Sequence, residues 1–136
     1  MITLLDKKNI KFLVVHCSDT RDDWITSDIH KLHLEFGWDG IGYHKVIEKS
    51  GDIVNGRPEY WVGAHVKGYN DKSLGVCLIG KKNFNNLQLK SLKNVLSNWK
   101  NLYPKSQILG HRDIVTTHKT CPNFDVKKWC IAEKLC

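Results

Sequence analysis

Apolar residues form short, nearly unbroken runs at three places along the chain. These runs occupy residues 11–16, 73–80 and 107–109, and glycine or polar residues flank them. Apolar runs of this length are typical of strands that are buried on both faces of a sheet. The pattern therefore predicts three buried strands, with His16 at the end of the first and His111 just after the third.

Elsewhere, apolar positions recur every three or four residues, which is the spacing of an amphipathic helix. One such segment follows the N-cap candidates at 26–28 and stops at Gly37. A longer apolar stripe covers 89–103 and ends before Pro104, and a shorter one begins at Val126. We therefore expect three helices.

His30 and His33 lie in the first predicted helix at a spacing of three residues, which in principle lets them share a metal ion. We favour a structural interpretation, with one histidine on the polar face of the helix and the other partly packed.

The middle of the chain contains a hairpin pattern and a long loop. Residues 43–48 read as a strand of mixed polarity, 49–52 as a tight turn and 53–54 as the returning strand. The segment 55–70 is rich in aromatic residues and glycine, so we expect an ordered surface loop that walls a binding groove. Strands alternating with helices predict an α/β sheet with helices on its faces, within a single domain spanning 1–136.

The composition narrows the choice of partners only slightly. The 136 residues carry a formal net charge of +7, which favours an anionic partner such as nucleic acid, a membrane surface or a carboxylate-rich polymer. No apolar run approaches the length of a membrane span, so no membrane insertion is expected. Residues 1–6 break too early for a signal peptide, so we expect the protein to stay in the cytoplasm where it is made.

The cysteine count is odd, which favours buried thiols and a metal ligand over a disulfide framework. Cys17 and Cys77 lie in or beside apolar runs and are expected to be buried. Cys130 and Cys136 are interpreted as packing or tail residues. A disulfide between them is expected only after exposure to an oxidising compartment.

The candidate chemistry lies in two segments, 14–18 and 110–122. Two histidines and a cysteine suit zinc, and three protein ligands with one open position describe a catalytic site. His16 and His111 are expected to be neighbours, because ligand sites gather where the strands of an α/β sheet end. Lys119 precedes Cys121 by two residues and places a positive charge beside such a metal. This combination suggests hydrolysis of a carbonyl compound, with a cation stabilising the oxyanion.

Six sequence blocks, taken together and in this order, resemble the zinc-dependent N-acetylmuramoyl-L-alanine amidase family, which also includes the peptidoglycan recognition proteins. The likeness is strongest to small phage amidases of the endolysin type. The blocks lie at 14–18, 37–38, 42–44, 63–70, 73–80 and 121–125.

The resemblance implies a central mixed β-sheet flanked by helices, one bound zinc ion, and hydrolysis of the amide between N-acetylmuramic acid and L-alanine. Position by position, the family's functional residues fall on His16, His111 and Cys121 as metal ligands, Tyr43 and Lys119 as catalytic residues, and His65 and Asn70 at the substrate groove. A tyrosine both donates and accepts hydrogen bonds, so Tyr43 is expected to position the water or to shuttle its proton.

One departure from the family pattern concerns the loop before Cys121. His111 and Cys121 are ten residues apart, a longer spacing than in the small phage relatives. The longer loop carries His118, and His118 with Cys121 forms a rival ligand pair. We retain His111 as the ligand and interpret His118 as an exposed loop histidine. The sequence leaves open whether His118 replaces or assists His111.

Three functions remain open at this stage. We favour a phage endolysin that acts on bacterial peptidoglycan after the membrane is breached, and we expect a monomer. The first alternative is a non-catalytic peptidoglycan-binding module, which the intact ligand set and Tyr43 argue against. The second is a regulatory binder of a polymerase. Nucleic acid is disfavoured as a partner, and salt-dependent binding to DNA would support this last reading.

Overall fold

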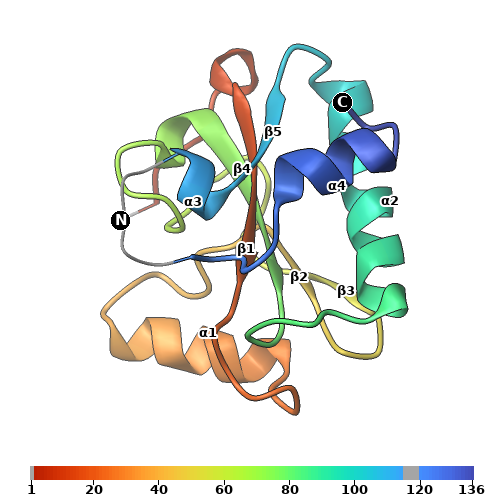
Figure 1. The fold of residues 1–136 in the computed structure, drawn as a ribbon. Helices are drawn as coiled ribbons and strands as arrows, with labels where there is room; N and C mark the ends of the chain where they lie inside the picture. The colour runs from red at the N-terminus through yellow and green to blue at the C-terminus, as the bar shows by residue number, and fades with distance from the viewer. Residues whose placement is uncertain (1, 115–119) are drawn as a thin grey trace.

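A five-stranded sheet forms the centre of the computed structural model, which describes residues 2–114 and 120–136. Its strand order is β3-β2-β4-β1-β5 (Figure 1). The strands are β1 (Phe12–Cys17), β2 (Lys45–Ile47), β3 (Ile53–Asn55), β4 (Ser73–Leu78) and β5 (Gln107–Gly110). Every neighbouring pair is parallel except the β2–β3 hairpin, so the sheet is mixed. The expected fold class is confirmed.

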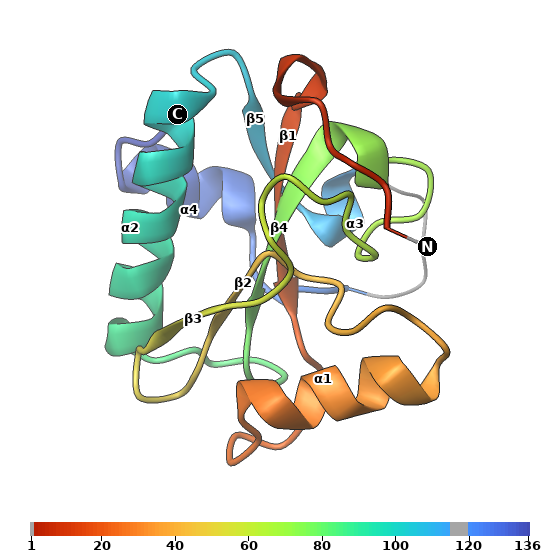
Figure 2. The ribbon, with the colours of Figure 1, turned by 180° about the vertical axis from the view of Figure 1, so that it is seen from behind.

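Helices cover both faces of this sheet. They are α1 (Thr26–Glu35), α2 (Asn86–Leu102), α3 (His111–Ile114) and α4 (Val126–Ala132), with 3-10 turns η1 (Lys7–Asn9) and η2 (Asn70–Lys72). In both views α2 and α4 lie on one side of the sheet, and α1 and α3 lie on the other (Figures 1 and 2).

The alternation of side chains along β1 divides the interior into two layers. Leu13 and Val15 face α2 and α4 and belong to the larger apolar cluster, which includes the fully buried Trp99. Val14 and His16 must therefore point to the opposite face. The smaller cluster includes Ile29 of α1 and four residues from the sheet and its loops: Ile41, Val46, Cys77 and Ile79. The period of β1 thus places His16 on the α1 side.

The helix boundaries follow local capping. Helix α1 begins at Thr26, and the Asp28 carboxylate accepts a hydrogen bond from the Ile25 backbone N–H (2.9 Å). Helix α2 begins three residues before the predicted apolar stripe, because Asn85 and Gln88 cap each other reciprocally. Gly37, with φ of 85°, follows the end of α1 as expected.

The hairpin is confirmed, but its first strand is shorter than predicted. Residues Tyr43 and His44 precede β2 and instead bond through their carbonyls to the N–H groups of Arg57 and Gly56 (2.8 and 3.0 Å). His44 also donates its backbone N–H to Gly75 of β4 (2.9 Å). The segment before β2 is therefore fixed between the sheet and the following loop.

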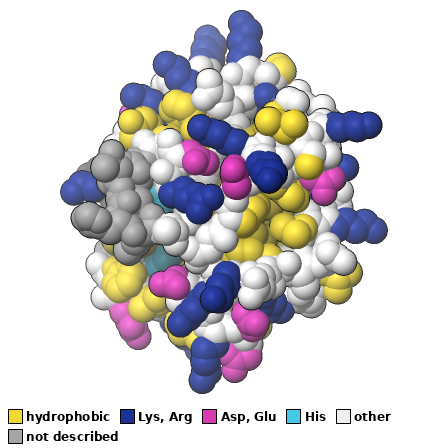
Figure 3. All heavy atoms as spheres, viewed as in Figure 1, with side chains coloured by type: hydrophobic (Ala, Val, Ile, Leu, Met, Phe, Trp, Pro, Cys, Tyr) yellow, Lys and Arg dark blue, Asp and Glu magenta, His cyan; other side chains and the backbone are white. Residues whose placement is uncertain are grey.

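Positive side chains are scattered over the surface. Lys and Arg residues project around the visible face with acidic residues between them, and they do not gather into one patch there (Figure 3).

Within the described part of the chain, no helix combines the length and hydropathy needed to cross a bilayer.

Candidate metal centre and active-site cleft

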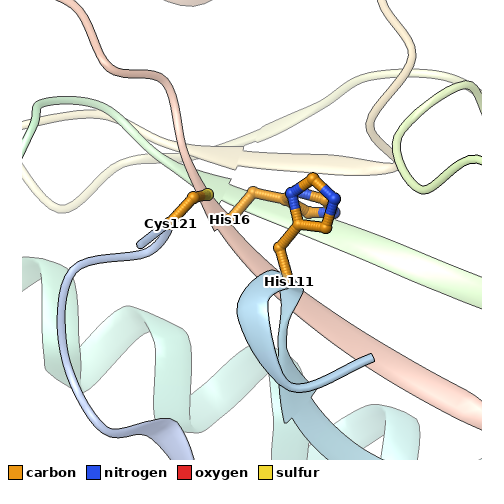
Figure 4. Close-up of side chains that lie close together, drawn as sticks. All are labelled: His16, His111 and Cys121. Carbon is orange, nitrogen blue, oxygen red and sulfur yellow. The ribbon is translucent and has the colours of Figure 1, made fainter. Parts of the chain in front are cut away.

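Three side chains from separate segments converge at the end of β1. The ligand atoms of His16, His111 and Cys121 all lie within 4.8 Å of one another (Figure 4). The β1–β5 register pairs Val15 with Gly110, so the next residue of each segment lies at the same edge of the sheet. The two imidazole centroids are 4.8 Å apart. The expected proximity of His16 and His111 is therefore observed.

Backbone hydrogen bonds hold Cys121 in this position. Its carbonyl accepts a hydrogen bond from the Arg112 N–H of α3 (3.0 Å). Its sulfur accepts one from the Cys17 N–H at the end of β1 (3.1 Å). Asn123, with φ of 67°, turns the chain and donates its side-chain amide to the Lys81 carbonyl. The cysteine is thus tied to both strand ends that carry the histidines.

The ionisation of these groups suits a metal site. Burial, together with His111, lowers the pKa of His16 well below its ordinary value, so this ring is neutral and offers a lone pair. The hydrogen bond with the Cys17 side chain, with burial, raises the pKa of the Cys121 thiol. A thiolate at this position therefore requires a compensating cation. Two neutral imidazoles and one thiolate form a donor set that divalent zinc prefers.

A cleft of about 1440 Å³ opens over this cluster. All the candidate residues that the structure describes line it: His16, Tyr43, His65, Asn70, His111 and Cys121. The 55–70 segment forms part of its wall, as predicted. The lining also includes the aromatic side chains of Trp24, Phe36 and Trp38 and the basic ones of Arg21, Lys67 and Lys81. The cleft thus combines apolar walls with polar groups that converge on one point, as small-molecule sites do.

Tyr43 stands beside the proposed ligands, with its ring centroid 5.1 Å from that of His16. Burial raises the pKa of Tyr43 well above 10, and the neighbouring Cys77 adds to this shift. The hydroxyl therefore keeps its hydrogen at neutral pH, and it interacts with the side chain of the neighbouring Cys77.

The two histidines of α1 hold the segment that leads to Tyr43. His33 Nδ1 accepts a hydrogen bond from the Gly42 N–H (2.9 Å), and His30 Nδ1 accepts one from the Ile41 N–H (3.1 Å). His30 is exposed and His33 is buried, in agreement with the structural interpretation of this pair.

His65 and Asn70 are both engaged in hydrogen bonds at the cleft wall. The Asn70 side-chain oxygen accepts from the N–H groups of His65 and Val66 (2.9 and 2.8 Å). His65 Nδ1 lies 2.9 Å from His16 Nε2, and its Nε2 lies 3.2 Å from Ser73 Oγ. Burial lowers the pKa of His65 well below its ordinary value, as it does for His16. Direct contact of His65 or Asn70 with substrate stays a prediction.

Comparison with known proteins agrees with this arrangement. Residues 6–124 match the N-acetylmuramoyl-L-alanine amidase family. The chain belongs to this family. It is 40% identical to an endolysin of Enterobacteria phage K11 over 125 residues, which are 85% of this chain and 82% of that protein. An endolysin of Escherichia phage T7 is 36% identical over 127 residues, covering 86% and 83% of the two chains.

A solved structure shows the same fold in an amidase. The endolysin N-acetylmuramoyl-L-alanine amidase LysCS from Clostridium intestinale is 30% identical and superposes with a TM-score of 0.85. The match covers 98% of this chain and 88% of that one. The family expected from the sequence blocks and the amidase class of the enzyme are confirmed.

Two residues of the expected site, His118 and Lys119, lie outside the described residues, so their roles remain predictions. Among the described residues, the cluster contains His111, as we expected.

Sequence reasoning missed two supporting groups of this amidase, the Ser73 hydroxyl and the Cys17 N–H. The sequence contains a weak indication of Ser73, because it is a hydroxyl residue at the start of an apolar run. A backbone N–H gives none.

The metal-free protein is expected to lose stability as the pH falls from about 6.5 toward 4. Burial lowers the pKa of His44 from 6.5 to about 4, and the ring contacts the Gly75 N–H (3.1 Å) and the Trp61 carbonyl (2.9 Å). Between about pH 6.5 and 4, His44 therefore binds a proton in the unfolded chain but not in the folded chain, so acidification favours unfolding. His44 alone accounts for about 2 kcal/mol between pH 7 and 5.

Urea unfolding at pH 7, 6 and 5 in the presence of chelator measures this effect. In the His44→Gln variant, which keeps a donor and an acceptor but does not titrate, the pH slope should become shallower. Equal slopes in the two proteins would contradict the assignment.

Proposed function

We propose that this amidase hydrolyses the amide between the lactyl group of N-acetylmuramic acid and L-alanine, using one zinc ion held by His16, His111 and Cys121. The observation that carries the proposal is the convergence of these ligand atoms within 4.8 Å in a cleft, in a chain of this family. Three protein ligands leave one position for water or substrate, as catalytic zinc sites require.

The chain's own groups have distinct roles in this proposal. Zinc, when bound, supplies Lewis acidity that lowers the pKa of water toward about 7. The protonated hydroxyl of Tyr43 donates a hydrogen bond to the amide carbonyl as negative charge develops on its oxygen. The proposed role of Lys119 is to supply a cation that stabilises the same oxygen. The Cys17 N–H holds the Cys121 sulfur in place.

The cleft lining supports a peptide substrate that carries carboxylates. Arg21, Lys67 and Lys81 line the cleft and are exposed, so they can attract the negative groups of a stem peptide. His65 and Asn70 on the loop wall provide further contact surface. This arrangement supports bacterial peptidoglycan as the partner.

We also propose an endolysin role, because phage proteins named endolysins match most of this chain. In this role the protein is made in the host cytoplasm and reaches the cell wall once the inner membrane is breached.

Product analysis of digested peptidoglycan tests the proposal. Digestion should release peptides with a new amino-terminal L-alanine and should produce no new reducing sugar ends. Activity should vanish on chelation and return with zinc. New reducing ends without free L-alanine amino groups would contradict amide cleavage, and so would the absence of any product from folded, zinc-loaded protein.

A further inference from the structure

A chain of hydrogen bonds leads from His16 away from the cleft. His16 Nε2 lies 2.9 Å from His65 Nδ1, and His65 Nε2 lies 3.2 Å from Ser73 Oγ. Ser73 Oγ in turn donates to the Tyr69 carbonyl oxygen (2.7 Å). Ser73 is fully buried at the start of β4. The chain thus joins a proposed metal ligand to a backbone acceptor through two side chains.

The Tyr69 carbonyl fixes the direction of every bond in the chain. A carbonyl carries no hydrogen, so Ser73 must donate its single hydroxyl hydrogen to it. Ser73 Oγ can then only accept from His65, which places a hydrogen on His65 Nε2. A neutral imidazole has one ring hydrogen, so His65 Nδ1 carries a lone pair and accepts from His16. His16 must therefore carry its hydrogen on Nε2.

We propose that His65 and Ser73 are positioning residues that hold His16 in the Nε2-protonated tautomer and so present its Nδ1 lone pair to the metal. The inference rests on the proposed zinc site. A ligating histidine binds through one nitrogen while the hydrogen bond at the other fixes its tautomer and ring orientation. His65 thus acts on the reaction through His16, in addition to any contact with substrate.

The packing around His65 leaves its ring little freedom. A Cβ at Gly75 would lie 2.5 Å from His65 Nδ1, and one at Gly63 would lie 2.7 Å from His65 Cδ2. Both positions therefore need glycine for the imidazole to fit. The backbone of His65 is also fixed by the Asn70 side chain. Gly63, Gly75 and Asn70 therefore restrict the position of the His65 ring, whose Nδ1 faces His16.

The tautomer can be observed directly in the native, metal-free protein. Long-range ¹H–¹⁵N correlation spectra distinguish a protonated Nε2 from a protonated Nδ1 in each histidine ring. The proposal predicts that His16 and His65 are both protonated on Nε2. A hydrogen on Nδ1 of His16 would overturn it, without any need for a variant.

A matched pair of serine variants tests the effect on the metal. Ser73→Ala removes the anchor of the chain and should weaken zinc affinity by about 10-fold or more, as measured against a chromophoric chelator. Ser106→Ala is the control, because Ser106 is also buried and donates to a carbonyl, that of Tyr103 (2.6 Å), at a distance from the cluster. Its zinc affinity should stay native.

Equal zinc affinity in the two variants, whether native or weakened in both, would overturn the proposal. Native protein that binds no zinc would instead contradict the proposed function. The tautomer of His16 would then still decide whether the hydrogen-bond chain runs as inferred.

Discussion

Replacing Cys121 by alanine is expected to weaken zinc binding by more than about 100-fold and to abolish peptidoglycan hydrolysis. Loss of a residue that hydrogen-bonds to a metal ligand already weakens metal affinity by about 10- to 100-fold, and Cys121 is proposed to bind the zinc ion itself. It is also the only negative ligand of the proposed set, so its loss leaves the metal charge uncompensated. Zinc competition with a chelator and release of L-alanine amino groups measure the two effects.

Cys136→Ala is the matched control for this experiment. Cys136 is an exposed thiol at the end of the chain and lies outside the cleft lining. Its variant should bind zinc and hydrolyse peptidoglycan as the native protein does. Native affinity in Cys121→Ala would show that the metal has other ligands, with His118 the first to examine.

Tyr43→Phe is expected to lower kcat by about 10²- to 10³-fold while zinc affinity stays native. The substitution removes one hydrogen-bond donor to the developing oxyanion, and such a loss has this magnitude in other hydrolases. Phenylalanine keeps the ring that packs near His16, so the metal ligands should not move. Because burial raises the pKa of Tyr43, the deficit should stay constant between pH 6 and 9.

Tyr60→Phe provides the control for this second change. Tyr60 is 60% exposed and does not line the cleft, so its hydroxyl can be removed without consequence for catalysis. Equal kcat values for native protein and Tyr43→Phe would rule out the proposed role. A parallel loss of zinc affinity would assign Tyr43 to metal binding instead.

The hydrophobic periodicity was sufficient to predict an α/β sheet and to bring together two of the proposed metal ligands, His16 and His111. Buried runs identify strands, and strand ends of an α/β sheet meet at one edge, so the sequence alone predicts that His16 and His111 lie near each other. These predictions rest on local geometry that every strand shares.

The support around the site could not be predicted in this way. The contact between His65 and His16 depends on the path of the 55–70 loop, which has no periodicity. The Cys17 N–H reaches Cys121 across 104 positions of sequence, and a backbone group leaves no mark in the residue pattern. The reciprocal capping of Asn85 and Gln88 makes α2 begin before its apolar stripe, and the stripe alone did not predict this. The catalytic role of Tyr43 came from the family resemblance rather than from any pattern, whereas the spacing of Lys119 and Cys121 had already suggested a cation beside the metal.

A zinc titration of the metal-free protein, with hydrolysis measured at each step, tests the central claim most directly. We expect activity to rise linearly and to reach its plateau at one zinc per chain. X-ray absorption of the loaded protein should then show one sulfur at about 2.3 Å and two imidazole nitrogens at about 2.0–2.1 Å. Hydrolysis by rigorously metal-free protein, or a zinc shell without sulfur at the activity plateau, would contradict it.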